Sequence, residues 1–253
     1  MKSFIILLLS FMLWLSTGNV ANAQGDVQSA SVNDETLSLR EWHAGDVVSM
    51  SAIEQFGGIE RCFAIERIPD EVWKNMQGKS YRPNRYIGRD DLRYLRLLHY
   101  DYDKRIHVGE MVCNSKIANI LIRIFKELYD AQYPIQQVLL PDVYNADDET
   151  QMRANNTSCF CYRTVSNSKK LSAHARGLAV DLNTLYNPYC KIRKDGTWYV
   201  QPSTARKYCD RTKSFKYKID ENDLAYRLFT KNGFTWGGHW RSSKDYQHFE
   251  WRE

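Results

Sequence analysis

The chain has 253 residues and a formal net charge of +5; Lys2 is the only charged residue before residue 24, so the remainder carries +4. Such a small excess gives no support for a nucleic-acid partner. The length suits one hydrophobic core of about 200 ordered residues, and we expect a monomer.

The N-terminus has the pattern of a signal peptide over residues 1–23. Lys2 precedes an apolar stretch from Phe4 to Leu15, and Ala21-Asn-Ala23 offers a cleavage site before Gln24. The apolar stretch is shorter than the roughly 20 residues that span a bilayer. We therefore expect a protein without a transmembrane segment, secreted across the inner membrane to the periplasm or beyond. An uncleaved anchor is the alternative.

Residues 24–46 are polar and predict a tail or linker, followed by a single domain over residues 47–253. Residues 90–98 fit a helix or a strand. The clearest helix is predicted over residues 115–132, where apolar side chains recur at helical spacing after a capping Asn114. A second helix is predicted over residues 221–231 with Asp220 as its cap.

Three short strands are predicted in the C-terminal half, at residues 158–164, 177–182 and 245–251. In the second, apolar residues alternate with Gly177 and Asp181, which indicates one buried face. His174 lies an odd number of positions from Asp181, so Gly177 is the expected turn that brings them together. The fold class is therefore α+β, a small antiparallel sheet with helices packed on its other face.

All six cysteines lie after residue 24, as suits an oxidising compartment. Cys190 and Cys209 bracket an insertion whose residues 194–198 predict a hairpin turn, so we expect these two to be bridged. Cys159 and Cys161 lack the spacing of a structural zinc site, and we expect disulfide or small buried roles for them.

His174, Asp181 and His248 supply two imidazoles and a carboxylate, the ligand set of a catalytic zinc site with one open position. Asp245 is the candidate general base, and Arg163 would face the metal from the first strand. Each residue also has an ordinary interpretation: Asp245 as a turn residue, Arg163 as a surface arginine. His239 fits a loop or rim position better than a ligand.

These motifs resemble the D-Ala-D-Ala metallopeptidase family, which includes VanY-type D-alanyl-D-alanine carboxypeptidases and L-alanyl-D-glutamate endolysin-type peptidases. The resemblance runs over about residues 109–251 and is carried by four features: Arg163, the run from Ser172 to Asp181, the run from Gly233 to Trp240, and Asp245 with His248. It implies one zinc ion on His174, Asp181 and His248, Asp245 as base, and substrate contacts from Arg163 and Ser172.

The roles of the other cleft candidates stay open. Glu250 fits a partner of a ligand histidine or a cleft wall. Trp236 and Trp240 fit a cleft lining, with Trp240 taken as a substrate contact, or core packing. Ser172 fits a substrate contact, a support for the ligand shell, or a strand-end hydroxyl.

The function expected is a zinc peptidase acting on peptidoglycan stem peptides, as a D,D-carboxypeptidase or an L-alanyl-D-glutamate endopeptidase. Basic residues outnumber acidic ones between residues 163 and 218. Such a rim fits carboxylate-bearing wall material or a solvated face without a partner. The alternatives are an inactive hedgehog-like zinc-containing binding module and a metal-free, disulfide-stapled wall-binding protein.

Overall fold

The computed structural model describes residues 42–163 and 171–252. The predicted signal peptide and most of the predicted tail lie outside the described residues. The end of that tail is packed: Trp42 lies against Phe56 with ring centroids 5.0 Å apart, and the Gly45 amide donates to the Val108 carbonyl. No helix among residues 42–163 and 171–252 combines the length and apolar character of a membrane span.

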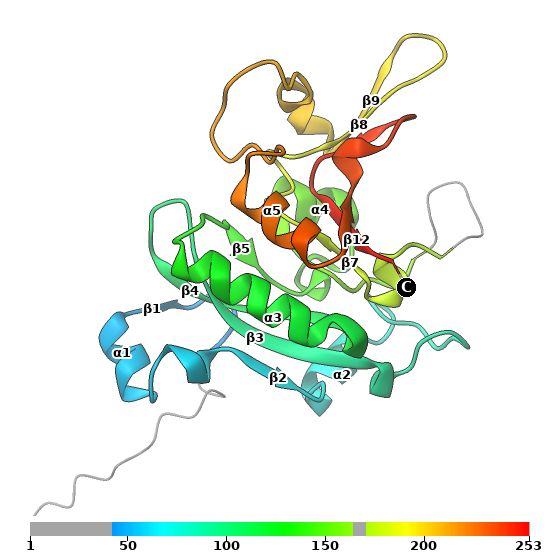
Figure 1. Cartoon of the computed structure of the whole chain (residues 1–253). Coiled ribbons are helices and arrows are strands. Elements are labelled where there is room, and N and C mark those ends of the chain that lie inside the picture. The colour runs from blue at the N-terminus through cyan, green and yellow to red at the C-terminus, as the bar shows by residue number, and fades with distance from the viewer. Residues whose placement is uncertain (1–41, 164–170, 253) are drawn as a thin grey trace, which may run out of the picture. The chain divides into compact units, whose positions relative to one another are not determined.

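The largest sheet is antiparallel and has the order β1-β4-β3-β2 (Figure 1). Its strands are β1 (Val47–Val48), β2 (Ala64–Glu66), β3 (Leu92–Tyr100) and β4 (Ile106–Asn114). β3 and β4 pair along their whole length as one hairpin. The open choice for residues 90–98 is therefore settled as a strand from Leu92 onward, while Asp90 and Asp91 end a short 3₁₀ helix. Its apolar residues do not alternate because Leu95 and Leu92 enter two different cores.

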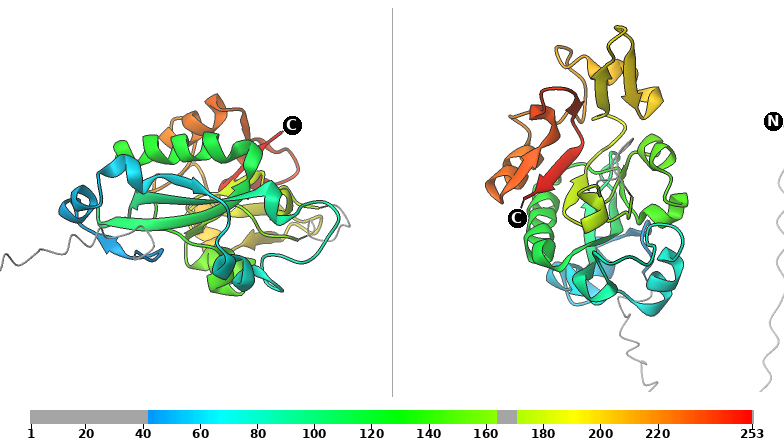
Figure 2. Two further views of the ribbon diagram at one scale, coloured as in Figure 1. Left: turned by 90° about the horizontal axis from the view of Figure 1, so that it is seen from below. Right: turned by 90° about the vertical axis from the view of Figure 1, so that its right-hand side faces the viewer.

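Helix α3 (Ser115–Asp130) lies along β3 and β4 (Figures 1 and 2). Asn114 caps it, because its side-chain oxygen accepts a hydrogen bond from the Lys116 amide at 3.0 Å. Its buried stripe includes Leu121, Ile124 and Phe125, as predicted from their spacing. The helix ends two residues before the predicted boundary.

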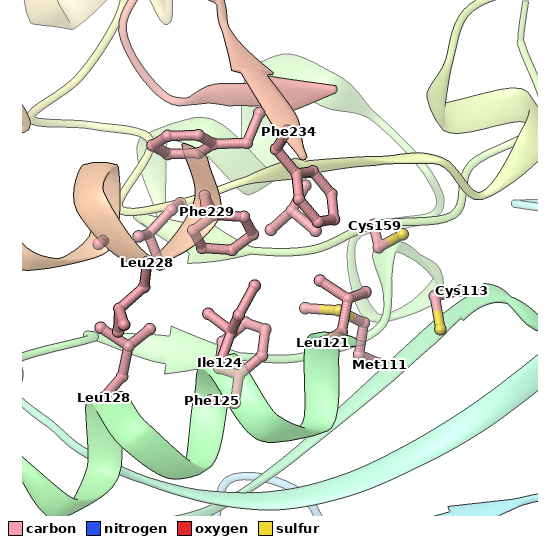
Figure 3. Close-up of a cluster of buried hydrophobic side chains, with 14 of the residues drawn as sticks. Met111, Cys113, Leu121, Ile124, Phe125, Leu128, Cys159, Leu228, Phe229 and Phe234 are labelled. Atoms are coloured by element: carbon pink, nitrogen blue, oxygen red, sulfur yellow. The ribbon is translucent and has the colours of Figure 1, made fainter. Parts of the chain in front are cut away.

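A second antiparallel sheet, with the order β10-β12-β7, consists of β7 (Ala179–Asp181), β10 (Phe234–Trp236) and β12 (His248–Trp251). Its inner face packs on α3 and on α5 (Leu224–Lys231), where the rings of Phe229 and Phe249 stack 4.5 Å apart. Figure 3 shows Phe229 beside Phe234 above the α3 side chains Ile124 and Phe125. The expected small antiparallel sheet with helices on one face is confirmed.

Helix α5 starts later than predicted. The cap is Asp223, which accepts hydrogen bonds from the amides of Ala225 and Tyr226, whereas Asp220 accepts from Asn222 in the preceding turn. Both aspartates are good caps by type, and the sequence pattern did not distinguish a turn from the first turn of a helix.

The predicted hairpin is present as β8 (Tyr189–Ile192) and β9 (Trp198–Gln201), joined to β11 (Lys244–Asp245) in a sheet of order β11-β8-β9. The predicted Cys190–Cys209 disulfide is also present. It joins β8 to the 3₁₀ helix η6 (Ser203–Cys209). Cys159 and Cys161 are free and buried, so the disulfide alternative for them is wrong and the small buried role is confirmed.

The predicted strand at residues 158–164 is wrong. β6 (Asn156–Thr157) pairs in parallel with β5 (Gln137–Val138), Ser158 forms an isolated bridge to Asp181, and residues 159–163 belong to no strand. Consecutive amides bond to different segments: Phe160 to Val112, Cys161 to His174, and Tyr162 to Ser80. Apolar and polar residues alternate in this segment as in a strand, but its backbone bonds to three separate segments instead of to one neighbouring strand.

The remaining elements are short. The α-helices are α1 (Met50–Gln55), α2 (Asp70–Met76) and α4 (Asp148–Arg153). The further 3₁₀ helices are η2 (Ile59–Cys62), η3 (Arg89–Asp91), η4 (Pro141–Tyr144), η5 (His174–Arg176) and η7 (Gly237–His239).

Candidate metal centre

The outer face of the β10-β12-β7 sheet brings two of the candidate ligands together. β12 pairs with β7 in the register that sets His248 directly opposite Asp181. His248 Nδ1 lies 3.0 Å from Asp181 Oδ1. The pairing expected from the alternation of the two strands is therefore present.

His174 reaches the same place through a tight turn. It opens the 3₁₀ helix η5, which ends at Gly177 with φ of +66°. A Cβ at Gly177 would lie 2.7 Å from the Asn114 backbone nitrogen, so glycine is required by both conformation and space. The predicted turn is thus confirmed, and it is pressed against the start of α3.

The three side chains converge on a common point. His174 Nε2 lies 3.2 Å from His248 Nδ1 and 3.2 Å from Asp181 Oδ2. One ligand atom from each residue lies within 4.8 Å of the other two, and both histidines are buried. Among the described residues, this is the only such group of three or more potential metal-binding side chains.

The other ring nitrogen of each histidine faces an oxygen atom. His174 Nδ1 lies 2.7 Å from the Cys159 carbonyl oxygen, and His248 Nε2 lies 3.5 Å from Glu250 Oε2. A proton on His174 Nδ1 donates to that carbonyl, which leaves the lone pair of Nε2 toward the centre. Oxygen partners of this kind hold metal-ligating histidines in orientation. The donor set therefore fits a divalent cation, and two imidazoles with one carboxylate suit zinc.

The centre is electrostatically uneven. Burial would raise the pKa of Asp181, but the imidazoles of His174 and His248 outweigh that effect and hold it well below its usual range. Burial and the neighbouring Asp181 carboxylate raise the pKa of Asp245. A carboxylate that takes up a proton more readily than usual is suited to proton transfer.

Asp245 is held close to the ligand cluster by the loop before it. It ends β11, and its Oδ1 atom is buried without a hydrogen-bond partner in the described part of the chain. Gly237 in η7 packs on it: a Cβ there would lie 2.5 Å from the Asp245 carbonyl oxygen and 3.2 Å from the His248 Cβ. The glycine pair at residues 237–238 was a signal for this close packing that the sequence analysis left unused.

Arg163 lies at the edge of the same site although its predicted strand is absent. Its Nε is 2.9 Å from Asp148 Oδ2 on α4, so the two side chains form an ion pair. The Nε atom nevertheless makes no hydrogen bond within the described residues. Burial opposes its charge, but the carboxylates of Asp148, Asp181 and Asp245 raise its pKa. Asp148 was not identified from the sequence, since one acidic residue in a polar helix carries no distinguishing pattern.

Ser172 supports the ligand turn directly. Its Oγ accepts a hydrogen bond from the Ala175 amide at 3.0 Å, and its own amide donates to the Arg163 carbonyl. Through these two bonds, one from its hydroxyl and one from its backbone amide, Ser172 links the Arg163 segment to the turn that carries His174.

Of the two candidate tryptophans, only one lies at the metal centre. Trp240 borders the centre, with its ring 5.2 Å from that of His248, whereas Trp236 is buried in the core and donates its indole N–H to the Tyr246 carbonyl. His239 is an exposed rim residue 2.9 Å from Glu221.

The candidate side chains predicted from the sequence, with the exception of Trp236 and His239, border one cleft of about 920 Å³. Its lining includes His174, Asp181 and His248, with Asp245 and Arg163. Two imidazoles and one carboxylate in a cleft, with a further carboxylate beside them, define the class of site used by mononuclear metallohydrolases.

The comparison with protein families agrees with this geometry. The family model described as D-alanyl-D-alanine carboxypeptidase matches residues 166–251. This stretch holds His174, Asp181, Asp245 and His248, and it confirms the resemblance to D-Ala-D-Ala metallopeptidases. The match covers 86 of the 253 residues and supports a peptidase acting on peptidoglycan at a general level; Arg163 lies just before it. Searches of curated proteins and of solved structures find no match.

Proposed function

We propose that this protein is a zinc-dependent peptidase that hydrolyses peptidoglycan stem peptides in the cell envelope, as a D,D-carboxypeptidase or an L-alanyl-D-glutamate endopeptidase. The observation that carries the proposal is the convergence of His174, Asp181 and His248 beside the buried carboxylate of Asp245, in one cleft. The family match over the same residues supports it.

One zinc ion per chain would be held by His174 Nε2, His248 Nδ1 and the Asp181 carboxylate. When bound, zinc supplies Lewis acidity that polarises a carbonyl and makes water a nucleophile near neutral pH. The Cys159 carbonyl and Glu250 keep the two imidazoles turned toward the centre. Removal of the Glu250 carboxylate is therefore expected to weaken metal binding without removing a ligand.

Asp245 is the general base of the proposed reaction. Its Oδ1 has no hydrogen-bond partner in the described chain, so it is free to accept the proton of the attacking water. The same carboxyl group then passes that proton to the leaving amine as the peptide bond breaks. Burial and Asp181 raise its pKa, which favours the protonated state that this second step requires.

Arg163, Ser172 and Trp240 are the proposed substrate contacts in the cleft, and Trp240 lies beside His248. The guanidinium of Arg163 binds a substrate carboxylate or the oxyanion, since its planar fork makes two parallel hydrogen bonds to such a group. The Asp148 carboxylate lies 2.9 Å from the Nε atom of Arg163 and so keeps a negative charge beside the guanidinium. Secretion through the N-terminal signal peptide would bring the enzyme to its substrate.

Digestion of purified muropeptides by the protein lacking residues 1–23, followed by mass analysis of the products, tests the proposal. Loss of one D-alanine identifies a carboxypeptidase, and a cut between L-alanine and D-glutamate identifies an endopeptidase. We expect little cleavage of casein. Efficient cleavage of casein without action on muropeptides would contradict the proposed substrate but not the metal site. Zinc binding without cleavage of either substrate would favour the alternative of an inactive zinc-containing binding module.

A further inference from the structure

The β8–β9 hairpin has two chemically different faces. Side chains alternate along a strand, and directly paired residues share a face. One face carries the pairs Tyr189 with Gln201 and Lys191 with Tyr199, with Arg193 next in the alternation. All five line the cleft of the metal centre, whereas none of the residues of the opposite face does.

The opposite face holds the hairpin in place. It carries Cys190, which is bridged to Cys209, and Trp198, over which the Arg206 guanidinium lies at 4.0 Å. β8 also pairs with β11, so that Tyr189 stands opposite Asp245. The cleft face of the hairpin is thus a fixed continuation of the wall that carries the proposed base. Figure 1 shows the hairpin, in yellow, extending away from β7 and β12.

The cations of this face have no carboxylate within ion-pair distance among the described residues, and the one acidic neighbour of Arg193 is Asp195 in the exposed hairpin turn, which is outside the cleft. Neither Lys191 nor Arg193 forms an ion pair within the described chain, and both are exposed. Arg193 lies over the Tyr199 ring at 4.9 Å, and Tyr199 makes an edge contact with Tyr189. Arg163, at the metal end of the cleft, already has Asp148 as a partner. Unpaired positive charge in the cleft is therefore concentrated on the hairpin.

The cleft is consequently divided in charge, with the carboxylates of Asp148, Asp181, Asp245 and Glu250 and the paired Arg163 at the metal end, and Lys191 and Arg193 on the hairpin. An extended peptide that places a carboxylate away from its cleaved bond matches both ends, and the two tyrosine rings offer flat surfaces to its backbone.

We propose that the cleft face of the β8–β9 hairpin is a second substrate subsite, which binds a carboxylate-bearing residue of the peptide at a distance from the cleaved bond. Lys191 and Arg193 supply its positive charge, and Tyr189 and Tyr199 its walls. The subsite rests on the proposed peptidase function, and it selects acidic stem peptides over those whose carboxylates are amidated.

The test compares one synthetic stem peptide, with free carboxylates away from the cleaved bond, with its carboxamide counterpart. The zinc-loaded protein should show a KM lower for the acidic form by about three- to tenfold, as two partly exposed ion pairs provide. Lys191→Gln with Arg193→Gln should abolish this difference by raising the KM for the acidic form, with kcat unchanged. The matched control, Lys194→Gln with Lys207→Gln, removes the same charge from exposed positions outside the cleft and should keep the difference.

Equal KM values for the two peptides, or a preference that survives the Lys191 and Arg193 changes, would overturn the subsite while the peptidase stands. A control variant that loses the preference equally would also overturn it, since a general field would then suffice. If neither peptide is cleaved, the peptidase proposal fails, and calorimetric binding of both peptides to chelator-treated protein decides the subsite. Tighter binding of the acidic peptide that depends on Lys191 and Arg193 would retain it, and equal binding would reject it.

Discussion

His248 stands directly opposite Asp181 across the β7–β12 pair, with its Nδ1 atom 3.0 Å from the carboxylate. A shift of one residue in this register would turn His248 to the core side of the sheet and bring Phe249 to the centre. The packing of Phe249 on Phe229 prevents that shift. The hydrophobic core thus fixes the position of the candidate ligands.

Loss of either histidine should abolish zinc binding. His174→Ala or His248→Ala removes one of three ligands, so we expect zinc content to fall from about one ion per chain to a small fraction. Metal analysis after dialysis measures it. His239→Ala, which changes an exposed histidine outside the cluster, is the control and should keep full occupancy. Full occupancy in both ligand variants would refute the assignment.

Asp245→Asn should retain zinc and lose activity. The amide has nearly the same shape but cannot accept the proton of water, so we expect kcat to fall by on the order of a hundredfold or more. Zinc content and circular dichroism should match the unchanged protein. Asp90→Asn, which changes an exposed aspartate outside the cleft, serves as the control. Undiminished activity with zinc bound would move the base elsewhere, first to Glu250.

The parts of the site that follow from local pattern could be predicted from the sequence. The alternation in residues 177–182 and 248–251 indicated two strands with a polar face each, and the odd spacing of His174 and Asp181 required a turn at Gly177. These relations depend only on strand geometry and on the conformational freedom of glycine.

The parts that depend on distant contacts could not. The carbonyl that orients His174 belongs to the backbone of Cys159, and every residue has such a group. Asp148 lies beside Arg163 only because the fold brings the start of α4 to the Arg163 segment. β3 gave no clear strand signal because both of its faces are buried. Residues 158–163 gave a false strand signal, since the backbone of this alternating segment bonds to several separate segments and not along one neighbouring strand.

Arg163→Lys should lower turnover while keeping zinc. Lysine preserves the charge but loses the planar fork that binds a carboxylate through two hydrogen bonds, so we expect kcat/KM for stem peptides to fall severalfold or more. Asp148→Asn should produce a smaller loss in the same direction, because it frees Arg163 from its partner. An unchanged kcat/KM in Arg163→Lys would show that the arginine does not contact the substrate.

Removal of the Cys190–Cys209 bridge should loosen the hairpin before it unfolds the core. The bridge spans 19 residues, and on the loop-entropy estimate such a closure stabilises by about 3 kcal/mol. In Cys190→Ser with Cys209→Ser, trypsin should cut after Lys191, Arg193 or Lys194 much faster than in the unchanged protein. Cutting outside residues 189–210 should change little. Equal cutting rates in the two proteins would show that β-sheet pairing alone holds the hairpin.

The buried His99, which lies outside the metal centre, should make the free energy of unfolding depend on pH. Burial, together with the nearby His107 ring, lowers the pKa of His99 to about 4, and its Nδ1 lies 2.9 Å from the Ile135 carbonyl oxygen. In the unfolded chain a histidine titrates near about 6.5. Between these values the unfolded state binds the extra proton, so stability is full above about pH 6.5 and falls as the pH drops toward 4.

The contribution of His99 amounts to at most about 3 kcal/mol at the lower end of that window. Urea unfolding of chelator-treated protein at pH 7, 6 and 5 measures the loss. His99→Asn keeps a donor for the Ile135 carbonyl but does not titrate, so its stability should fall less steeply over this range, whatever its absolute value. His43→Asn changes an exposed histidine and should leave the slope as it was. The same slope in His99→Asn as in the unchanged protein would show that His99 does not cause the acid sensitivity.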